Sequence, residues 1–250
     1  MTLPDCDPTP SYLVFGATGG IGSDLCRRFA SHGARMVLAA RNIDKLERLA
    51  AELHAVASPL DATRFEEVDA CVEEAVRLHG RLDGVANCIG SLLLKPAHAT
   101  SETEWLSAVA ANLTTAFAVV RAGAKAMLGT GGAIALVSSA AGRVGLVNHE
   151  AIAAVKAGVI GLTLSAAATY APRGIRVNCV APGLVRTPMT DRLTSNEVSL
   201  EASTAMHALG RIGEPGDVAS ALEWLLNPEQ SWVTGQVLGI DGGLASVRPR

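Results

Sequence analysis

Short, continuous apolar runs recur along this chain of 250 residues and alternate with segments of helical character. Runs that do not alternate between apolar and polar residues are typical of parallel strands covered by helices on both faces. Strands are expected at Ser11–Phe15, Arg35–Ala40, Val56–Leu60, Leu82–Cys88, Gly132–Ser138, Ile175–Val180 and Val237–Ile240. The pattern predicts a single α/β domain built on a doubly wound parallel sheet of about seven strands, with helices on both faces.

The domain is expected to span residues 11–250, after a Pro-rich N-terminal tail at residues 1–10. A long stretch at about residues 183–210 has no helical or strand period and contains Thr187-Pro188 and the polar pair Ser195-Asn196. Loops of this length in compact domains usually take part in function. We therefore expect this segment to form a flap over a small-molecule substrate.

Charge and hydropathy argue against two classes of partner. The formal net charge is -3 and the chain has no basic cluster, whereas nucleic-acid binding needs several Lys or Arg side chains on one surface. No stretch approaches ~18 uninterrupted apolar residues, and the first residues lack the positive start of a secretory signal. We expect a cytoplasmic protein that binds neither nucleic acid nor membrane.

A glycine-rich turn lies between the first expected strand and the first expected helix, where a Rossmann-type fold binds a dinucleotide. The turn consists of Gly16, Ala17, Thr18, Gly19, Gly20, Ile21 and Gly22. Glycines let the backbone approach a pyrophosphate closely, and the free amides at the helix start hold its negative charge. The sequence therefore predicts a nicotinamide dinucleotide site; a tight turn without a ligand is the alternative.

The end of the second expected strand indicates which dinucleotide is bound. An acidic residue there would hydrogen-bond the ribose hydroxyls of NAD, whereas Ala40 followed by Arg41 leaves room and positive charge for the 2′-phosphate of NADP. NADP is therefore favoured over NAD. The alternative is that Arg41 is a solvated surface charge.

Further motifs resemble those of the short-chain dehydrogenase/reductase family. Ser139 lies in Ala135–Gly142 at the end of the fifth expected strand, and Asn112 lies in Ala111–Thr114. The family pattern is also matched by Lys156, Asp61, Asn87, Gly90, Asn178, Pro182, Gly183, Thr187 and the closing run Gly235–Gly243. Together these motifs cover residues 11–243.

The resemblance implies an oxidoreductase that transfers hydride between NADP(H) and a small carbonyl or alcohol substrate, and that assembles as a homotetramer. In the family the Lys holds the nicotinamide ribose and lowers the pKa of a Tyr, the Ser orients the substrate carbonyl, and the Asn supports a water and Lys network. These roles would fall on Lys156, Ser139 and Asn112. The cofactor would be contacted by Gly16, Thr18, Gly19, Gly20, Ile21, Gly22, Arg41, Asp61, Asn87, Gly90, Lys156, Pro182, Gly183 and Thr187.

The chain departs from the family pattern at position 152. The family's Tyr precedes its Lys by four residues, because residues four apart share a helix face, but here that residue is Ile152. Isoleucine has no proton to donate. His149 lies seven residues before Lys156 on the same face and is the candidate replacement, since imidazole titrates near neutral pH and the enoyl-reductase branch of the superfamily places its Tyr at this offset.

Several interpretations stay open beside carbonyl reduction. In the first, the chain is an enoyl-type reductase of C=C bonds that uses His149. In the second, it is a catalytically silent subunit that binds or senses NADP. The alternative for His149 is that it only begins the helix. Independently of His149, Ile152 is either natural or an engineered replacement of Tyr. Ser139 favours an enzyme, because a pure cofactor binder has less use for that hydroxyl.

Overall fold

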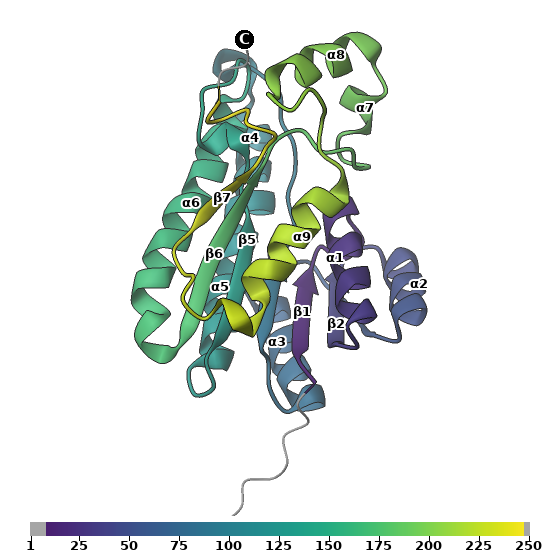
Figure 1. Ribbon diagram of the computed structural model, residues 1–250, viewed down its shortest axis with the longest axis vertical. Helices are drawn as coiled ribbons and strands as arrows, with labels where there is room; N and C mark the ends of the chain where they lie inside the picture. The colour runs from purple at the N-terminus through teal and green to yellow at the C-terminus, as the bar shows by residue number, and fades with distance from the viewer. Residues whose placement is uncertain (1–8, 248–250) are drawn as a thin grey trace, which may run out of the picture.

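The computed structural model describes residues 9–247, so most of the expected N-terminal tail lies outside the described residues. Within this range, seven parallel strands form one sheet in the order β3-β2-β1-β4-β5-β6-β7 (Figure 1). The strands are β1 (Ser11–Phe15), β2 (Arg35–Ala40), β3 (Val56–Pro59), β4 (Gly84–Asn87), β5 (Gly132–Val137), β6 (Ile175–Pro182) and β7 (Val237–Ile240). The prediction of a doubly wound parallel sheet in a single α/β domain is confirmed.

The central strands are continuous apolar runs because both of their faces are buried. All five residues of β1 are buried, and β1 lies between β2 and β4, with Phe15 beside Ala39 on one side and Asn87 on the other. β3, at one edge of the sheet, is half-buried or exposed along its length. Apolar side chains at every position are thus needed only in the interior of the sheet.

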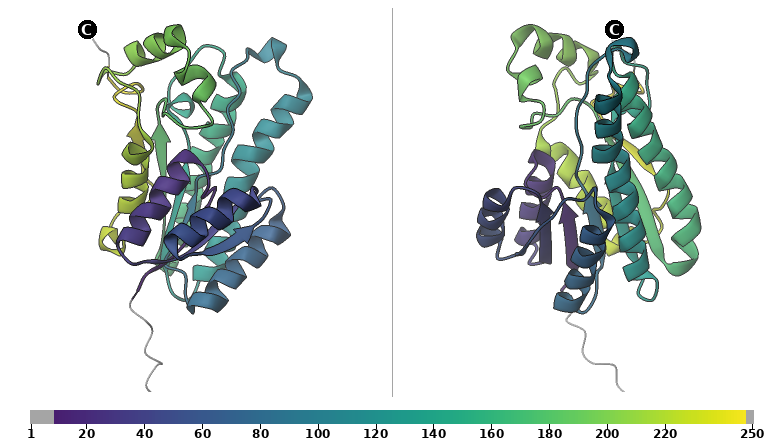
Figure 2. Two further views of the ribbon diagram at one scale, coloured as in Figure 1. Left: turned by 90° about the vertical axis from the view of Figure 1, so that its right-hand side faces the viewer. Right: turned by 180° about the vertical axis from the view of Figure 1, so that it is seen from behind.

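Helices cover both faces of the sheet (Figure 2). One face is covered by α1 (Gly20–Ser31), α2 (Ile43–Leu53) and α9 (Pro215–Leu226), and the other by α3 (Phe65–His79), α5 (Thr115–Met127) and α6 (Glu150–Tyr170). Leu25 and Leu222 belong to the apolar layer on the first face, and Val72 and Val159 to the layer on the second. Each layer buries the apolar side of its helices, so the sheet is the middle of a three-layer domain.

A π-helical turn at Val109–Thr114 joins α4 (Glu102–Ala108) to α5. α4 begins at Ser101, whose side chain forms a reciprocal capping box with Glu104. A π turn breaks the regular helical repeat and frequently marks a functional position. Here it contains Asn112, which is buried against the segment that follows β4.

Two helical segments, Glu102–Met127 and Glu150–Arg173, are long and apolar enough to cross a membrane by length and composition alone. Both pack against the sheet, where Val119 and Met127 of the first and Val159 of the second belong to one buried apolar cluster. They are core helices of the domain.

The order of the strands reverses between β1 and β4, and this places the site. In doubly wound sheets ligands bind beyond the carboxyl ends of the strands at such a reversal. α7 (Asp191–Thr194) and α8 (Glu197–Met206) lie above this end of the sheet (Figure 1). The segment expected to be a flap therefore contains two short helices that its sequence did not reveal.

Candidate active site

The glycine-rich turn connects β1 to α1 and has no room for side chains at two positions. Gly16 has a φ of +75°, and a Cβ there would lie 2.8 Å from the backbone of Cys88 and Ile89. A Cβ on Gly22 would collide with the carbonyl oxygen of Gly16. Gly19 caps α1 without a side-chain hydrogen bond, which leaves the first amides of the helix for an anionic ligand.

A cleft of about 570 Å³, here called the β1–β4 cleft, runs from this turn across the carboxyl ends of the strands. At one end it is lined by Arg41 and Asp61. Arg41 is exposed, and within residues 9–247 the structure gives its guanidinium no hydrogen bond or ion pair. Hydrogen bonds from Thr63 hold the pKa of Asp61 below its ordinary value, and the charges of Arg41 and Arg64 act in the same direction. An unpaired cation therefore stands beside an ionised carboxylate at this end.

The segment after β4 forms the inner part of the cleft. Asn87 shapes it, because its Oδ1 accepts a hydrogen bond of 3.1 Å from the backbone of Ile89. Gly90 then passes so close to two polar groups that a Cβ would lie 3.1 Å from Asn112 Oδ1 and 3.3 Å from Lys156 Nζ. The backbone at Gly90 thus brings Asn112 and Lys156 together.

Lys156 is a buried amine on α6. Its side chain reaches from α6 to the end of β5, where Nζ donates a hydrogen bond of 3.0 Å to the carbonyl oxygen of Val137. Only 6% of the residue is exposed, and this burial lowers the pKa of Lys156 to about 8. The amine therefore changes charge close to neutral pH rather than near its ordinary value of 10.5.

Two serines follow β5 and have different partners. Ser138 donates from Oγ to the backbone oxygen of Lys156 at 2.7 Å, which ties α6 to the sheet. Ser139 accepts a hydrogen bond of 3.1 Å from the backbone of Ala141 and starts a 3-10 turn. The hydrogen of the Ser139 hydroxyl is not used by that contact.

Ile152 and His149 lie on the first turns of α6. Ile152 is 2% exposed, one helical turn before Lys156. His149 is the N-cap residue, and its Nδ1 lies 2.7 Å from the carbonyl oxygen of Val147, which can only accept. Nδ1 therefore carries the proton and Nε2 remains for another partner. The described contacts of His149 are with its own turn and include neither Ser139 nor Lys156.

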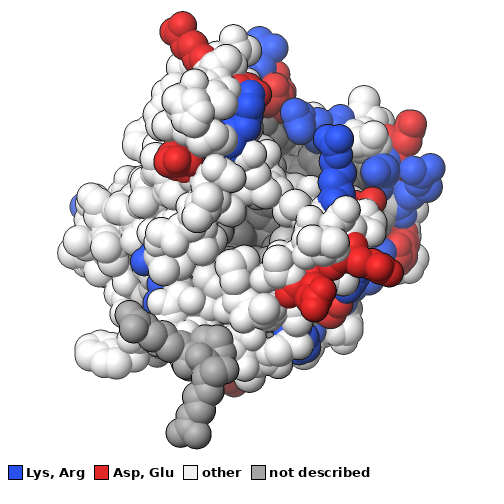
Figure 3. All heavy atoms as spheres, turned by 90° about the horizontal axis from the view of Figure 1, so that it is seen from above, with Lys and Arg blue, Asp and Glu red and all other residues white. Residues whose placement is uncertain are grey.

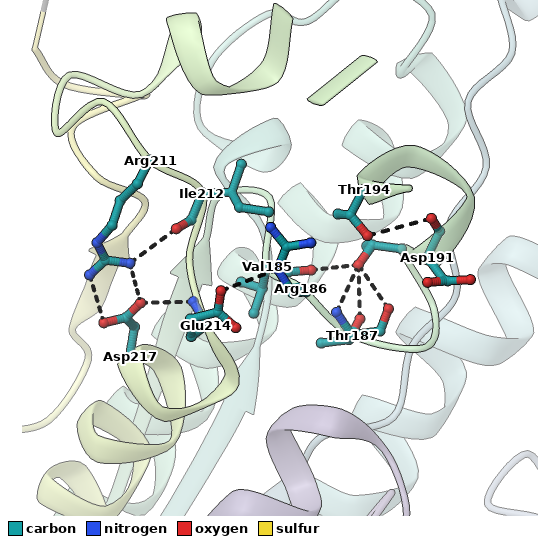
Figure 4. Close-up of polar contacts among 10 residues, drawn as sticks. Val185, Arg186, Thr187, Asp191, Thr194, Arg211, Ile212, Glu214 and Asp217 are labelled. Atoms are coloured by element: carbon teal, nitrogen blue, oxygen red, sulfur yellow. Dashed lines mark hydrogen bonds and ion pairs between the residues drawn. The ribbon is translucent and has the colours of Figure 1, made fainter. Parts of the chain in front are cut away.

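The flap is fixed at its base by polar contacts (Figure 4). Its two ends meet at a bridge between Val185 and Gly213. Next to this bridge in the chain, Arg186 pairs with Glu214 at 3.3 Å. Arg211 binds both carboxylate oxygens of Asp217 at 2.6 and 2.9 Å.

Within this frame the start of the flap touches the glycine-rich turn. A Cβ on Gly20 would lie 2.8 Å from Cγ2 of Thr187, and Met189 lines the β1–β4 cleft. Thr190 accepts a hydrogen bond from the backbone of Thr187 and donates to that of Val185. β6 ends at Pro182, and Gly183 follows it directly.

A second cavity of about 580 Å³ lies on the other side of the end of β6. His207, beside it, is 3% exposed, and both of its ring nitrogens are bonded, Nδ1 to the Ser203 oxygen at 2.7 Å and Nε2 to the backbone of Leu184 at 3.2 Å. Viewed from above, this end of the molecule is hollowed near its centre (Figure 3). Arg41 lines the β1–β4 cleft, and the Lys156 amine lies against Gly90, which also lines it, so this cleft is the candidate active site.

Six of the predicted site residues line this cleft, namely Gly16, Thr18, Gly19, Arg41, Asp61 and Gly90, whereas Gly183 lines the second cavity. The structure also adds residues that the sequence analysis missed. Ser91 and Met189 line it, and His207 holds the end of the flap. No spacing signal distinguishes these residues in the sequence, since each depends on contacts between distant segments.

A family model described as enoyl-(acyl carrier protein) reductase matches residues 16–245 of the chain. The chain is 37% identical over 242 residues to a 3-oxoacyl-(acyl-carrier-protein) reductase of Thermotoga maritima, covering 93% of this chain and 96% of the relative. It is also 37% identical over 238 residues to galactitol 2-dehydrogenase (L-tagatose-forming) of Cereibacter sphaeroides, covering 92% of each chain.

Solved structures give the same picture. A short-chain type dehydrogenase/reductase from Mycobacterium ulcerans superposes with a TM-score of 0.91 at 31% identity, over 100% of this chain and 93% of that one. ElxO with NADP bound superposes with a TM-score of 0.90 at 29% identity, over 96% of this chain and 100% of that one. The similarity covers the sheet, both helix layers and the flap.

Proposed function

The chain belongs to the short-chain dehydrogenase/reductase family, and we propose that it transfers hydride between NADP(H) and a small carbonyl or alcohol substrate in the β1–β4 cleft. One observation carries this proposal: a buried amine, Lys156, lies with Asn112 against Gly90, which lines a cleft whose glycine-rich turn has no room for a side chain at Gly16 or Gly22. A nucleotide-binding turn alone would not need the buried amine.

The cleft fits NADP because its backbone cradle and its unpaired charge match a pyrophosphate and a 2′-phosphate. Gly16 and Gly22 leave the space that a Cβ would fill, and Arg41, whose guanidinium has no ion pair within residues 9–247, stands at the adenosine end. When bound, the nicotinamide supplies or accepts the hydride. The residues proposed to hold it are the turn from Gly16 to Gly22 with Thr18, Gly19, Gly20 and Ile21, then Arg41, Asp61, Asn87, Gly90, Lys156, Pro182, Gly183 and Thr187.

The proposed catalytic residues are Ser139, Lys156 and Asn112. Ser139 has an unused hydroxyl hydrogen with which to orient the substrate carbonyl. Lys156, as an ammonium ion, stabilises negative charge that develops on oxygen, and Asn112 fixes the segment that faces it. Ile152 occupies the position of the family's Tyr, so the proton must come from elsewhere.

His149 is the proposed source of that proton. With Nδ1 donating to Val147, Nε2 is the nitrogen that can carry and release a second proton. The alternative substrate is a C=C bond conjugated to a carbonyl, which His149 would protonate after hydride transfer. Because Ile152 is buried and apolar, a silent NADP-binding subunit is the second candidate function.

The test uses NADPH binding and loss of nicotinamide absorbance with panels of ketones and conjugated carbonyls. His149→Ala should lower turnover by ~10²–10⁴ and leave NADPH affinity unchanged. Ile152→Tyr should add or raise carbonyl reduction if the cleft accepts the larger ring. A protein that binds NADPH, reduces nothing, and gains activity only with Ile152→Tyr would be the silent subunit.

The proposed assembly is a cytoplasmic homotetramer with the flap at about residues 183–210 closing over the substrate. Apolar side chains on the outer surfaces of α4, α5 and α6 support self-association, since Leu106, Phe117 and Leu164 are 54%, 49% and 49% exposed. Light scattering should give the mass of four chains. A monomer mass at micromolar concentration would contradict this.

A further inference from the structure

Ser91 is held at two points by Asn112. The backbone N–H of Ser91 donates to Asn112 Oδ1 at 3.1 Å, and Asn112 Nδ2 donates to Ser91 Oγ at 2.9 Å. The second hydrogen on Nδ2 goes to the backbone oxygen of Ala108, also at 2.9 Å. Asn112 is 1% exposed, so the amide side of this clamp is buried, whereas Ser91 is half-buried.

The clamp determines what the Ser91 hydroxyl can still do. A hydroxyl has one hydrogen and two lone pairs, and a lone pair is taken by the amide of Asn112. Within residues 9–247 the structure provides no acceptor for the hydroxyl hydrogen, and Ser91 lines the β1–β4 cleft. The remaining hydrogen is therefore available to a ligand in that cleft.

The position of Ser91 indicates which part of a ligand it meets. Ser91 follows β4 and Ser139 follows β5, and these strands are neighbours whose ends pair at Asn87 and Leu136. The preceding residue, Gly90, lies against Lys156 Nζ. Ser91 thus directly follows the residue against which Asn112 and Lys156 pack, and three leucines follow it in the chain.

We propose that Ser91 is a second substrate-binding hydroxyl, which donates a hydrogen bond to the carbonyl oxygen of the substrate together with Ser139. This inference rests on the proposed function. Ile152 offers no hydrogen, so Ser91 supplies a donor to an oxygen that gains negative charge during hydride transfer. The hydrogen stays on Ser91, and no proton is transferred by this residue.

The experiment measures binding of cyclohexanone to the protein saturated with NADP⁺, a complex in which no hydride is available. Ser91→Ala should weaken cyclohexanone binding about tenfold, the effect of one lost hydrogen bond, without changing NADP⁺ affinity. Ser91→Thr keeps the hydroxyl and should restore most of the affinity. Thr100→Ala is the matched control, because Thr100 Oγ1 donates to the Pro96 oxygen in the same loop and does not line the cleft.

The same variants in steady-state assays separate this inference from the proposed function. If the protein reduces ketones and Ser91→Ala changes neither kcat/KM nor cyclohexanone binding, the role of Ser91 is refuted and the function stands. If no substrate is turned over but cyclohexanone binding depends on Ser91, the function fails and the role of Ser91 stands. A fall in NADP⁺ affinity with Ser91→Ala, or no cyclohexanone binding to the unaltered complex, would overturn the inference.

Discussion

Replacing Lys156 by Met should make the cofactor-free protein more stable at neutral pH. This gain in stability over the unaltered protein should become smaller as the pH rises. The replacement keeps the length of the side chain and removes a buried ammonium group. Burial lowers the pKa of Lys156 from 10.5 to about 8. Between these values the unfolded chain holds a proton at this amine that the folded protein lacks, so the free energy of unfolding rises with pH through that window.

The magnitude follows from the two pKa values. A lowering of the pKa from 10.5 to about 8 means that the buried ammonium destabilises the folded protein by about 3 kcal/mol. This destabilisation is fully present below a pH of about 8. About 2 kcal/mol of this should be recovered between about pH 7 and about pH 9.5. Lys156→Met also loses the hydrogen bond to Val137, worth about 1 kcal/mol, so its net gain near pH 7 is about 2 kcal/mol.

Guanidinium unfolding of both proteins at several pH values between about 7 and 9.5 measures the effect. The difference between the two proteins is the quantity to follow, because other groups titrate in this range. Burial raises the pKa of Cys88 to about 12 and of Cys71 and Cys179 to about 11, which lowers stability in both proteins as pH rises. A difference that does not change with pH would refute the reasoning that Lys156 is the titrating group.

Two further predictions concern the cofactor. Arg41→Ala should narrow the preference for NADPH over NADH by ~1–3 kcal/mol, the value of a well-formed charge-assisted contact, and calorimetry that finds equal affinities in the unaltered protein would remove Arg41 from the site. Gly22→Ala places a methyl against the Gly16 oxygen and should abolish NADPH binding and lower the melting temperature. Its matched control, Gly161→Ala in the helix α6, meets no atom within 4 Å and should raise stability by about 0.5–1 kcal/mol; equal behaviour of the two variants would contradict the steric argument.

The sheet was predictable from the sequence because the apolar content of a central strand reflects the burial of both its faces. The run Leu13-Val14-Phe15 is apolar at every position, and only a strand covered on both faces requires this. The glycine-rich turn was predictable for a similar reason, since its spacing fits a strand followed directly by a helix. Strand bounds differed only at the ends: β6 continues to Pro182, because Pro182 still pairs with Ile240 of β7.

The contacts of the candidate site were less predictable, because they join distant segments. The clamp between Ser91 and Asn112 spans 21 positions, and the π-helical turn around Asn112 has no sequence signature in the expected helix. The helices α7 and α8 were missed because their capping contacts, such as Asn196 with Ser199, are short local signals inside a polar stretch. Whether His149 supplies a proton stays a prediction, since its described contacts are local.

The burial of Lys156 bears on the difference between a silent subunit and an enzyme. Burial of the amine destabilises the folded protein by about 3 kcal/mol, and residues 9–247 provide it with one hydrogen bond, so the amine is a net cost to stability. Met would fill the same space between α6 and β5 with less destabilisation of the folded protein. The presence of the amine is therefore explained by a contact with a ligand. A subunit that only senses NADP could use the ammonium for the ribose, but it would have no use for the hydroxyls of Ser91 and Ser139, which follow the neighbouring strands β4 and β5. The buried cation and two donors at one edge of the sheet together favour an enzyme.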